Sequence, residues 1–411
     1  MRIAFVTYEC PPETGGGGIG TYVRQVSRML YRSGHSVTVF AGSGKKEAFW
    51  EDESIFRIPA TNWTEFNNVL PGYFNSLHRS EPFDVVECMD FCGCGLSIKK
   101  MLPTLPIVVR LHTPLYMVDR LLFQPLSLRG KVRFIAGALL RWKLPSLPLF
   151  PQPHNYRDEF AIIELAERVC SPSRSIYNEM LSLGYPLQDK TDFIPLPFAI
   201  PDALRSIIPR KAIREDPQIM FIGRMEKRKG VIDLARSIPL ILKRYPKAHF
   251  TFVGSPSQSP VPGVHMMDFL KKELYRYTGS VSFTGGVPPE QVPGYLSQGD
   301  IFVFPSHYES FGLVCCEAMA AGKAVVASRS GGMSEIIEEG TSGLLVPPHQ
   351  PQMLAAAVLK LIGNERLRLE MGTRARERIH EYLDGDRVVQ RQVGCYQKAI
   401  ELAIKKKQLT L

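Results

Sequence analysis

The residues whose types and spacing suggest chemistry lie in one stretch, YESFGLVCCEAMAAGKAVVAS. The apolar run just before it (300–306) predicts a strand, and residues 313–321 predict a helix. Glu309 would then lie in the loop and Glu317 inside the helix, with Gly312 just ahead of the helix. Because carboxylate oxygens accept hydrogen bonds from hydroxyl groups, the two glutamates could hold different hydroxyls of one ligand. The alternative is a capped helix with a solvated glutamate.

The start of this helix also predicts an anion site. The first backbone N–H groups of a helix have no partner within it, and they favour negative charge in front of them. The amides from Gly312 to Val314 would therefore face a phosphate. Cys315 and Cys316 follow at once, and we interpret them as packing thiols because no base stands beside them in the sequence.

A second source of positive charge is the stretch FIGRMEKRKG, in which a predicted strand ends at Gly223. Arg224 and Lys229 follow it, at the edge where parallel sheets commonly bind ligands. Two cations there can neutralise a diphosphate, and the arginine can do so through two parallel hydrogen bonds. The alternative is ordinary surface charge, because Lys227 and Arg228 are also present.

A run of glycines in PPETGGGGIGTY is a third candidate. Gly15, Gly17 and Gly20 satisfy the dinucleotide pattern GxGxxG, but the pattern begins well after the preceding strand. The next predicted strand also ends without the acidic residue that would hold a ribose, so a hydride-transfer enzyme is disfavoured. We interpret Gly16, Gly17 and Gly18 as a flexible loop that lets the backbone approach a phosphate or an acceptor.

Two separate sheets are needed to position these candidates. Each half of the chain alternates apolar runs with helix-periodic stretches, which predicts a parallel sheet covered on both faces. We therefore predict an α/β protein with two Rossmann-like, doubly wound domains, 1–200 and 201–385, that face a central cleft. A last helix (386–411) would cross back to the first domain. The main expected strands are 2–8, 35–42, 83–89, 106–112 and 169–173, then 218–224, 249–255, 281–286, 300–306 and 324–330.

Length, net charge and cysteine spacing limit the classes of protein to which this chain can belong. With 411 residues the chain is too long for one ordinary core, and its net charge of +10 favours acidic partners such as phosphates. No nucleic-acid recognition module is visible, so we expect no nucleic-acid partner. The eight cysteines form no paired CxxC motifs, and the sequence shows neither a signal peptide nor a membrane-spanning run. We therefore expect a cytoplasmic protein.

The basic segment 121–157 leaves two interpretations open. No acidic residue occurs between Asp119 and Asp158, and lysines and arginines are interleaved with apolar residues. Such a mixture suits peripheral contact with anionic lipid at the inner face of a membrane. It also suits an insertion that covers a charged ligand, which we favour because no clean amphipathic period is visible.

Several of these motifs together resemble a known family. GRMEKRKG, FPSHYESFGLVCCEAMAAGKAVVAS and GGMSEIIEEGTSGLLVPP are similar to the C-terminal domain of retaining GT-B glycosyltransferases of family four, the Glycos_transf_1 type. ETGGGGIGTYVRQVSRMLYRSGHSVTVFAG resembles their N-terminal domain, so the resemblance covers nearly the whole chain. It implies transfer of a hexose-type sugar from a nucleotide-diphosphate sugar to an acceptor hydroxyl, with retention and without a metal or other cofactor. The first domain would bind the acceptor and the second the donor.

The resemblance also implies roles for single residues. Arg224 and Lys229 match the pair that binds the donor diphosphate. Glu309 matches the first glutamate of the family motif, at the reaction centre, and Glu317 the second, which holds the ribose. His112, at the end of a predicted strand, matches a histidine near the transferred sugar. The remaining matches are the backbone of Phe311, Gly312, Leu313 and Val314 around the sugar and phosphates, and the loop of Gly16, Gly17 and Gly18 near the donor phosphate and acceptor.

Other functions and mechanisms remain open at this point. A GT-B nucleotide-sugar epimerase shares the architecture, and an inactive scaffold that binds sugar nucleotides is a further alternative. Retention requires a covalent intermediate or attack on the same face, and we favour the latter because no carboxylate is forced into the role of nucleophile. One departure from the family follows DFIP, where an asparagine–glycine pair is replaced by Leu196, Pro197 and Phe198.

Overall fold

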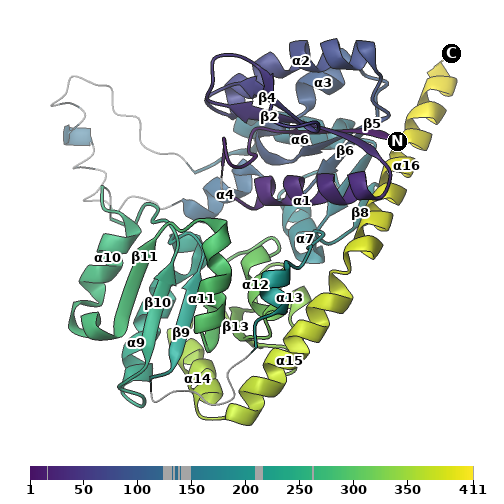
Figure 1. Ribbon diagram of the computed structural model, residues 1–411. Coiled ribbons are helices and arrows are strands. Elements are labelled where there is room, and N and C mark those ends of the chain that lie inside the picture. The colour runs from purple at the N-terminus through teal and green to yellow at the C-terminus, as the bar shows by residue number, and fades with distance from the viewer. Residues whose placement is uncertain are drawn as a thin grey trace.

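The computed structural model describes residues 1–15, 17–123, 132, 135–137, 139, 150–208, 216–261 and 263–410. They form two α/β domains, each built on a largely parallel sheet (Figure 1). The predicted fold of two Rossmann-like units is therefore confirmed. Gly16 and most of the 121–157 segment lie outside the described residues.

The first sheet has eight strands in the order β3-β4-β2-β1-β5-β6-β7-β8, and all its pairs are parallel except β3–β4. Its central strands are buried almost throughout, as continuous apolar runs must be when helices cover both faces. The strands are β1 (Arg2–Thr7), β2 (Ser36–Ser43), β3 (Phe49–Trp50), β4 (Ile55–Pro59), β5 (Val85–Met89), β6 (Ile107–Arg110), β7 (Arg168–Ser171) and β8 (Thr191–Phe193).

Helices on both faces cover this sheet. α1 begins just after the glycine loop, and α7 begins with the side chain of Ser173 accepting a hydrogen bond from the amide of Ile176. The helices are α1 (Gly18–Arg32), α2 (Trp63–Ser80), η1 (Phe91–Gly93), α3 (Leu96–Met101), α4 (Leu115–Leu122), η2 (Pro153–Tyr156), α6 (Arg157–Leu165) and α7 (Arg174–Ser182). The short helix α8 (Asp202–Arg205) follows β8 and packs on helices of the second domain.

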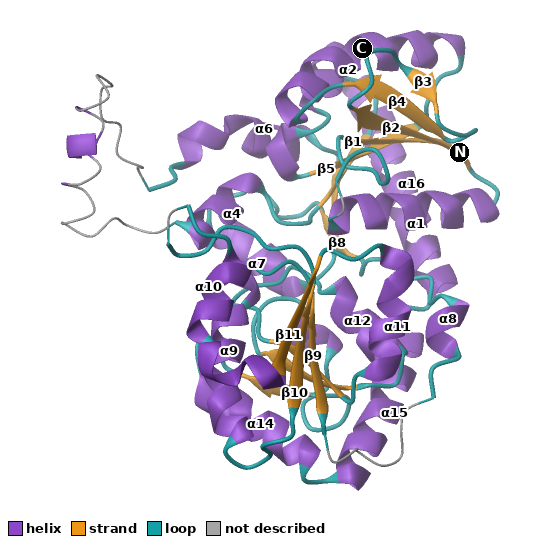
Figure 2. Cartoon of the chain, turned by 60° about the vertical axis from the view of Figure 1, so that its left-hand side comes forward, coloured by secondary structure: helices purple, strands orange, loops and turns teal. Residues whose placement is uncertain are grey.

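The second sheet has six parallel strands in the order β11-β10-β9-β12-β13-β14. Figure 2 shows it between α9, α10 and α14 on one side and α11 and α12 on the other. Its strands are β9 (Gln218–Ile222), β10 (His249–Val253), β11 (Val281–Gly285), β12 (Ile301–Phe304), β13 (Ala324–Ser328) and β14 (Leu344–Val346). Its helices are η3 (Lys227–Lys229), α9 (Val231–Leu242), α10 (Met266–Glu273), η4 (Tyr275–Ser280), η5 (Pro289–Gln291), α11 (Val292–Gln298), α12 (Leu313–Ala320), α13 (Met333–Ile336), α14 (Pro351–Ile362) and α15 (Glu365–Tyr382).

The last helix, α16 (Gly385–Thr410), leaves the second domain and packs on α1, β5, β6 and β7 of the first (Figure 1). Buried polar side chains hold it there. Both Tyr22 and Tyr396 donate a hydrogen bond to the carboxylate of Glu87, at 2.5 and 2.6 Å. Gln392 bonds to Glu87 and Arg110, so a residue of α16 completes a charged network inside the first domain.

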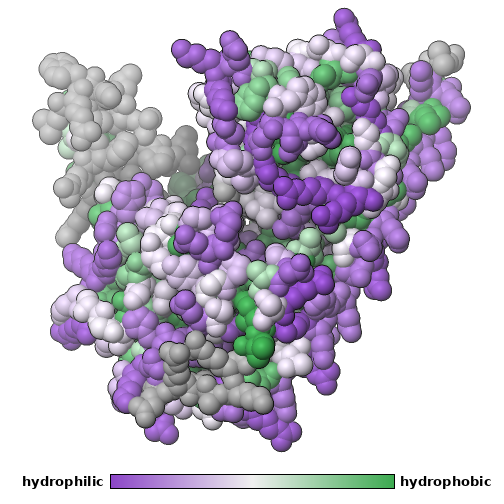
Figure 3. Space-filling view, in the orientation of Figure 1, coloured by the Kyte–Doolittle hydropathy of each residue, from purple (hydrophilic) through white to green (hydrophobic). Residues whose placement is uncertain are grey.

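The surface seen in Figure 3 is mostly hydrophilic, with apolar side chains in small groups. Among the described residues, no helix is long and apolar enough to cross a lipid bilayer. Leu196 and Phe198, which replace the expected asparagine–glycine pair, are buried.

Candidate active site

A lysine and a glutamate meet where β9 and β12 end. Nζ of Lys229, at the end of η3, bonds to Oε2 of Glu309, in the loop after β12. Nη1 of Arg228 lies 3.9 Å from the same oxygen. Burial acts to raise the pKa of Glu309, but Lys229 and Arg228 outweigh it and hold that pKa below its usual value. Glu309 is therefore a carboxylate at neutral pH.

Two glycines allow this close approach. Gly230 has a φ of 68°, and a Cβ there would lie 1.8 Å from the carbonyl oxygen of Pro305, so no other residue fits between η3 and the end of β12. Gly331 has a φ of 67°, and a Cβ there would lie 1.9 Å from the carbonyl oxygen of Glu309. The amide of Gly332 donates to that same oxygen at 2.7 Å. The backbone on both sides of the Lys229–Glu309 pair is thus fixed.

Arg224 lies at the same edge, with 65% of its side chain exposed. It faces the first domain, where it interacts electrostatically with the carboxyl group of Glu9. Burial raises the pKa of Glu9 and Arg224 partly opposes that rise. Because its guanidinium is open to solvent, Arg224 can reach a ligand between the domains, whereas Lys229 can do so only by sharing or leaving Glu309.

The helix α12 starts beside this pair, as predicted. Gly312 precedes it with a φ of 100°, Phe311 is buried, and Leu313 and Val314 are half-buried in its first turn. Glu317 lies one turn further in, where burial raises its pKa to about 7.

The two cysteines of α12 are inert. Cys315 and Cys316 are buried, and burial raises the pKa of both thiols. A high thiol pKa leaves almost no thiolate at neutral pH, and the thiolate is the reactive form. Their interpretation as packing thiols agrees with this burial.

His112 lies on the first-domain side, just past the end of β6. Burial, followed by the nearby charge of Arg110, lowers the pKa of His112 to about 3, so the imidazole is neutral. Its backbone amide donates to Oδ2 of Asp90 at 3.0 Å, and its ring meets the edge of Tyr22. Among the described residues, neither Nε2 of His112 nor Oδ1 of Asp90 has a hydrogen-bond partner. Buried polar atoms rarely stay unpaired, so these two atoms can accept a polar partner.

The glycine loop lies beside Glu9. Gly17 precedes α1 and Gly18 is its first residue, and Gly18 is exposed. A Cβ at Gly15 would lie 2.7 Å from Cγ of Glu9, and one at Gly17 would lie 3.1 Å from its Oε2. Gly16 lies outside the described residues. The loop therefore covers a carboxylate that the sequence analysis did not single out.

The loop of Glu309 also touches the first domain. Oγ of Ser173 donates to the carbonyl of Ser310 at 3.0 Å. The carboxylate of Glu335, from α13, accepts hydrogen bonds from the amides of Arg174 and Ser175 at the start of α7. These contacts place Glu309 at the interface between the domains.

Two acidic residues at the site were missed in the sequence. Asp90 directly follows the strand VVECM, one strand away from His112, and this position at a carboxyl end could have identified it. Glu9 lies two residues past β1 and ahead of the glycine run, and only the fold shows that it faces Arg224.

The comparison with known families agrees with this geometry. The family model described as Glycosyltransferase Family 4 matches residues 16–197. The family model described as Glycosyl transferases group 1 matches residues 205–378. Fold and family models thus define a glycosyltransferase of GT-B architecture. The chain belongs to the family-four glycosyltransferases of this group 1 type.

Several relatives match almost end to end. Glycogen synthase of Mycobacterium tuberculosis is 30% identical, over 93% of this chain and 91% of that protein. An uncharacterized glycosyltransferase of Methanocaldococcus jannaschii is 26% identical, over 98% of this chain and 99% of that one. A phosphatidyl-myo-inositol mannosyltransferase of Mycolicibacterium smegmatis is also 26% identical, over 93% and 90%.

Solved structures share the fold. The sucrose-phosphate synthase of Thermosynechococcus elongatus gives a TM-score of 0.73 at 21% identity, over 97% of this chain and 98% of that one. HepE of Anabaena, determined in complex with UDP and glucose, gives 0.67 at 17% identity, over 96% and 98%. At these identities the likeness shows the architecture alone.

Proposed function

We propose that the protein is a retaining glycosyltransferase that moves a hexose-type sugar from a nucleotide-diphosphate sugar to an acceptor hydroxyl, without a metal. The observation that carries the proposal is the Lys229–Glu309 pair beside the start of α12, with Arg224 exposed at the same edge. Cations, helix amides and a carboxylate within one short region suit a ligand that carries both phosphates and hydroxyls.

Donor binding would exchange partners at this pair. A diphosphate that accepts hydrogen bonds from Arg224 and the α12 amides would compete with Glu309 for Lys229. Glu309 would then be free to accept a hydrogen bond from the sugar. Glu317, whose pKa of about 7 lets it ionise near neutral pH, would accept from the two ribose hydroxyls.

The mechanism that fits this arrangement is attack on the same face. As the bond between the sugar and the β-phosphate breaks, negative charge grows on the phosphate. Arg224, Lys229 and the helix amides would stabilise it, at about 3 kcal/mol for one well-placed donor. The leaving phosphate would take the proton of the acceptor hydroxyl. His112 is neutral and has a free ring nitrogen, which suits a hydrogen bond to a sugar hydroxyl rather than proton transfer.

Calorimetric titration tests the donor. UDP, GDP and ADP, with their glucose, mannose and N-acetylglucosamine forms, would be titrated in EDTA, and we begin with UDP because HepE was determined with it. We expect tight binding of one nucleotide that is lost in Arg224→Ala and in Glu317→Ala. The proton NMR spectrum of the product then reports whether the anomeric configuration is retained.

Three results would refute this proposal. Turnover of Arg224→Ala within a few-fold of wild type would remove the diphosphate role. Consumption of the donor with no acceptor, giving a rearranged sugar, would favour the epimerase, an alternative that gains no support from the relatives named above. Binding of nucleotide without any turnover would favour the inactive scaffold.

The location and the acceptor are further parts of the proposal. We place the transfer in the cytoplasm, with the first domain on the acceptor side. Contact of 121–157 with anionic lipid stays a prediction, because most of that segment lies outside the described residues. Co-sedimentation with vesicles that contain anionic lipid would test it.

A further inference from the structure

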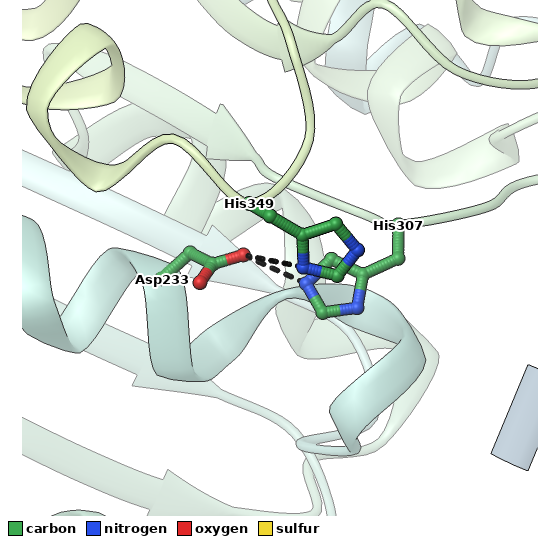
Figure 4. Close-up of side chains that lie close together, drawn as sticks. All are labelled: Asp233, His307 and His349. Carbon is green, nitrogen blue, oxygen red and sulfur yellow. Dashed lines mark hydrogen bonds and ion pairs between the residues drawn. The ribbon is translucent and has the colours of Figure 1, made fainter. Parts of the chain in front are cut away.

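One carboxylate and two imidazoles converge beside the elements that carry Lys229 and Glu309. Figure 4 shows Asp233 from the first turn of α9, His307 from the loop after β12 and His349 from the loop after β14. Nε2 of His307 lies 2.7 Å from Oδ2 of Asp233, and Nδ1 of His349 lies 3.8 Å from the same oxygen. In the described part of the chain, these three residues are the group whose potential ligand atoms lie within 4.8 Å of one another.

The sheet brings these distant residues to one point. β9, β12, β13 and β14 are neighbours in the sheet, so the segments that follow their carboxyl ends share one edge. Asp233 is buried, with 8% of its side chain exposed, and His349 is 63% exposed. The two imidazole rings lie 3.7 Å apart between centroids. The cluster is thus closed on the side of α9 and open to solvent at His349.

We propose that Asp233, His307 and His349 bind one divalent transition-metal ion of the Zn²⁺ type. Two imidazole nitrogens and one carboxylate oxygen suit zinc, whereas Mg²⁺ and Ca²⁺ prefer oxygen ligands alone. A tetrahedral ion with bonds of about 2.0–2.1 Å holds its ligand atoms roughly 3.3 Å apart, and the distances of 2.7 and 3.8 Å lie on either side of that value. Small movements of side chains would therefore form the site.

Binding needs only one exchange within the cluster. Nε2 of His307 would replace its hydrogen bond to Asp233 with a bond to the metal, and the imidazole would carry its proton on Nδ1 instead. The exposed side of His349 leaves the fourth position to water.

This ion would brace the donor side without taking part in the reaction. The amide of His307 donates to the carbonyl of Arg228 at 2.7 Å, and Ser330 donates to the carbonyl of His307 at 2.7 Å. His307 stands two residues before Glu309, and Asp233 four after Lys229. A metal would thus tie the start of α9 to the loop of Glu309. The inference does not rest on the proposed transfer, which needs no metal.

Metal titration of the full chain tests the site. After treatment with EDTA and its removal, Zn²⁺ is titrated in competition with a chromophoric chelator, and Co²⁺ is followed by its visible absorption. We expect one Zn²⁺ per chain, an affinity at least about tenfold lower in His349→Ala, and an unchanged affinity in the control His380→Ala, which alters an exposed histidine of α15. Zn²⁺ should raise the Tm of wild type and not that of His349→Ala.

The exposed position of His349 keeps this test decisive, because the truncation removes no buried side chain and should leave the fold intact. Equal Zn²⁺ affinity in wild type and His349→Ala would overturn the proposal, as would a wild type that takes up no Zn²⁺ from the chelator. Asp233 and His307 would then form only a hydrogen bond. Donor binding measured in EDTA is a separate result, so failure of the metal site and failure of the transferase proposal are distinguishable.

Discussion

The two sides of the domain interface hold their polar groups in different ways. On the second-domain side, Lys229 and Glu309 already pair with each other. On the first-domain side, the ring nitrogen of His112 and one oxygen of Asp90 are buried without a hydrogen-bond partner among the described residues. On the second-domain side a ligand would therefore compete with Glu309 for Lys229 while Arg224 stays open to it, whereas on the first-domain side it would only add contacts. The affinity for nucleotide alone should depend on the contacts of the second domain, and the turnover rate on those of both domains.

The largest effect should come from Lys229→Ala. Removing one preorganised cation from a leaving phosphate costs on the order of 10²–10³ in turnover. Steady-state rates with the donor found by calorimetry measure this loss. Lys243→Ala, an exposed lysine that follows α9, is the control and should leave the rate unchanged. A loss of only a few-fold in Lys229→Ala would contradict the role of Lys229 in stabilising the leaving phosphate.

Glu317→Gln should come next. The carboxylate would accept two ribose hydroxyls, and hydrogen bonds to a charged group contribute roughly 1.5–3 kcal/mol each. Loss of the charge should weaken nucleotide binding by about 10- to 100-fold. Calorimetry with nucleotide alone measures the effect, and Glu370→Gln, at an exposed position of α15, is the matched control. Unchanged affinity would place the ribose elsewhere.

The pH dependence of nucleotide binding should be smaller. The pKa of Glu317 is about 7 in the folded protein, so its carboxylate is lost as pH falls through 7. Affinity should fall below pH 7, by up to about tenfold per unit, and level off above it. Glu317→Gln should flatten that profile. A slope that persists in this variant would assign the titration to another group.

His112→Ala should have the smallest effect, and it should lower turnover without changing nucleotide affinity. A neutral hydrogen bond contributes about 1 kcal/mol, so turnover should fall roughly five- to tenfold. Nucleotide affinity should not change, because His112 lies on the other side of the interface. Because its pKa is about 3, the rate should also show no titration of this histidine near neutral pH. Weaker nucleotide binding in His112→Ala would mean that the two sides do not act separately.

Much of the fold could be predicted because buried parallel strands are continuous apolar runs. The expected strands agree with β1, β2, β5, β9, β10 and β12 to within about two residues at either end. The two-residue β3, the five-residue β4 and the three-residue β8 were missed, although β4 lies inside the sheet between β3 and β2. β3 and β8 are edge strands, so a single neighbour decides their pairing and the sequence pattern carries little signal.

Site residues within one local segment could also be predicted, whereas those from distant segments could not. Glu309, Gly312 and Glu317 belong to one strand–loop–helix unit, so local pattern was enough to bring them together. Asp90 and Glu9 belong to the site because they interact with residues far along the chain: Asp90 accepts a hydrogen bond from His112, and Glu9 lies in the field of Arg224. No spacing within one segment predicts these interactions, because the first depends on the order of strands in a sheet and the second on how the two domains meet.

The path of α16 limits how the domains can move. The chain passes from the first domain to the second after β8, and returns between α15 and α16. Hydrogen bonds from Gln392 and Tyr396 to Glu87 anchor α16 on the first domain, so the return connection is held there by buried contacts. A body attached at two points keeps one rotational degree of freedom, about the axis that joins them. The two domains should therefore open and close by rotation about one axis. Each closure would return Arg224 to the same place opposite Glu9.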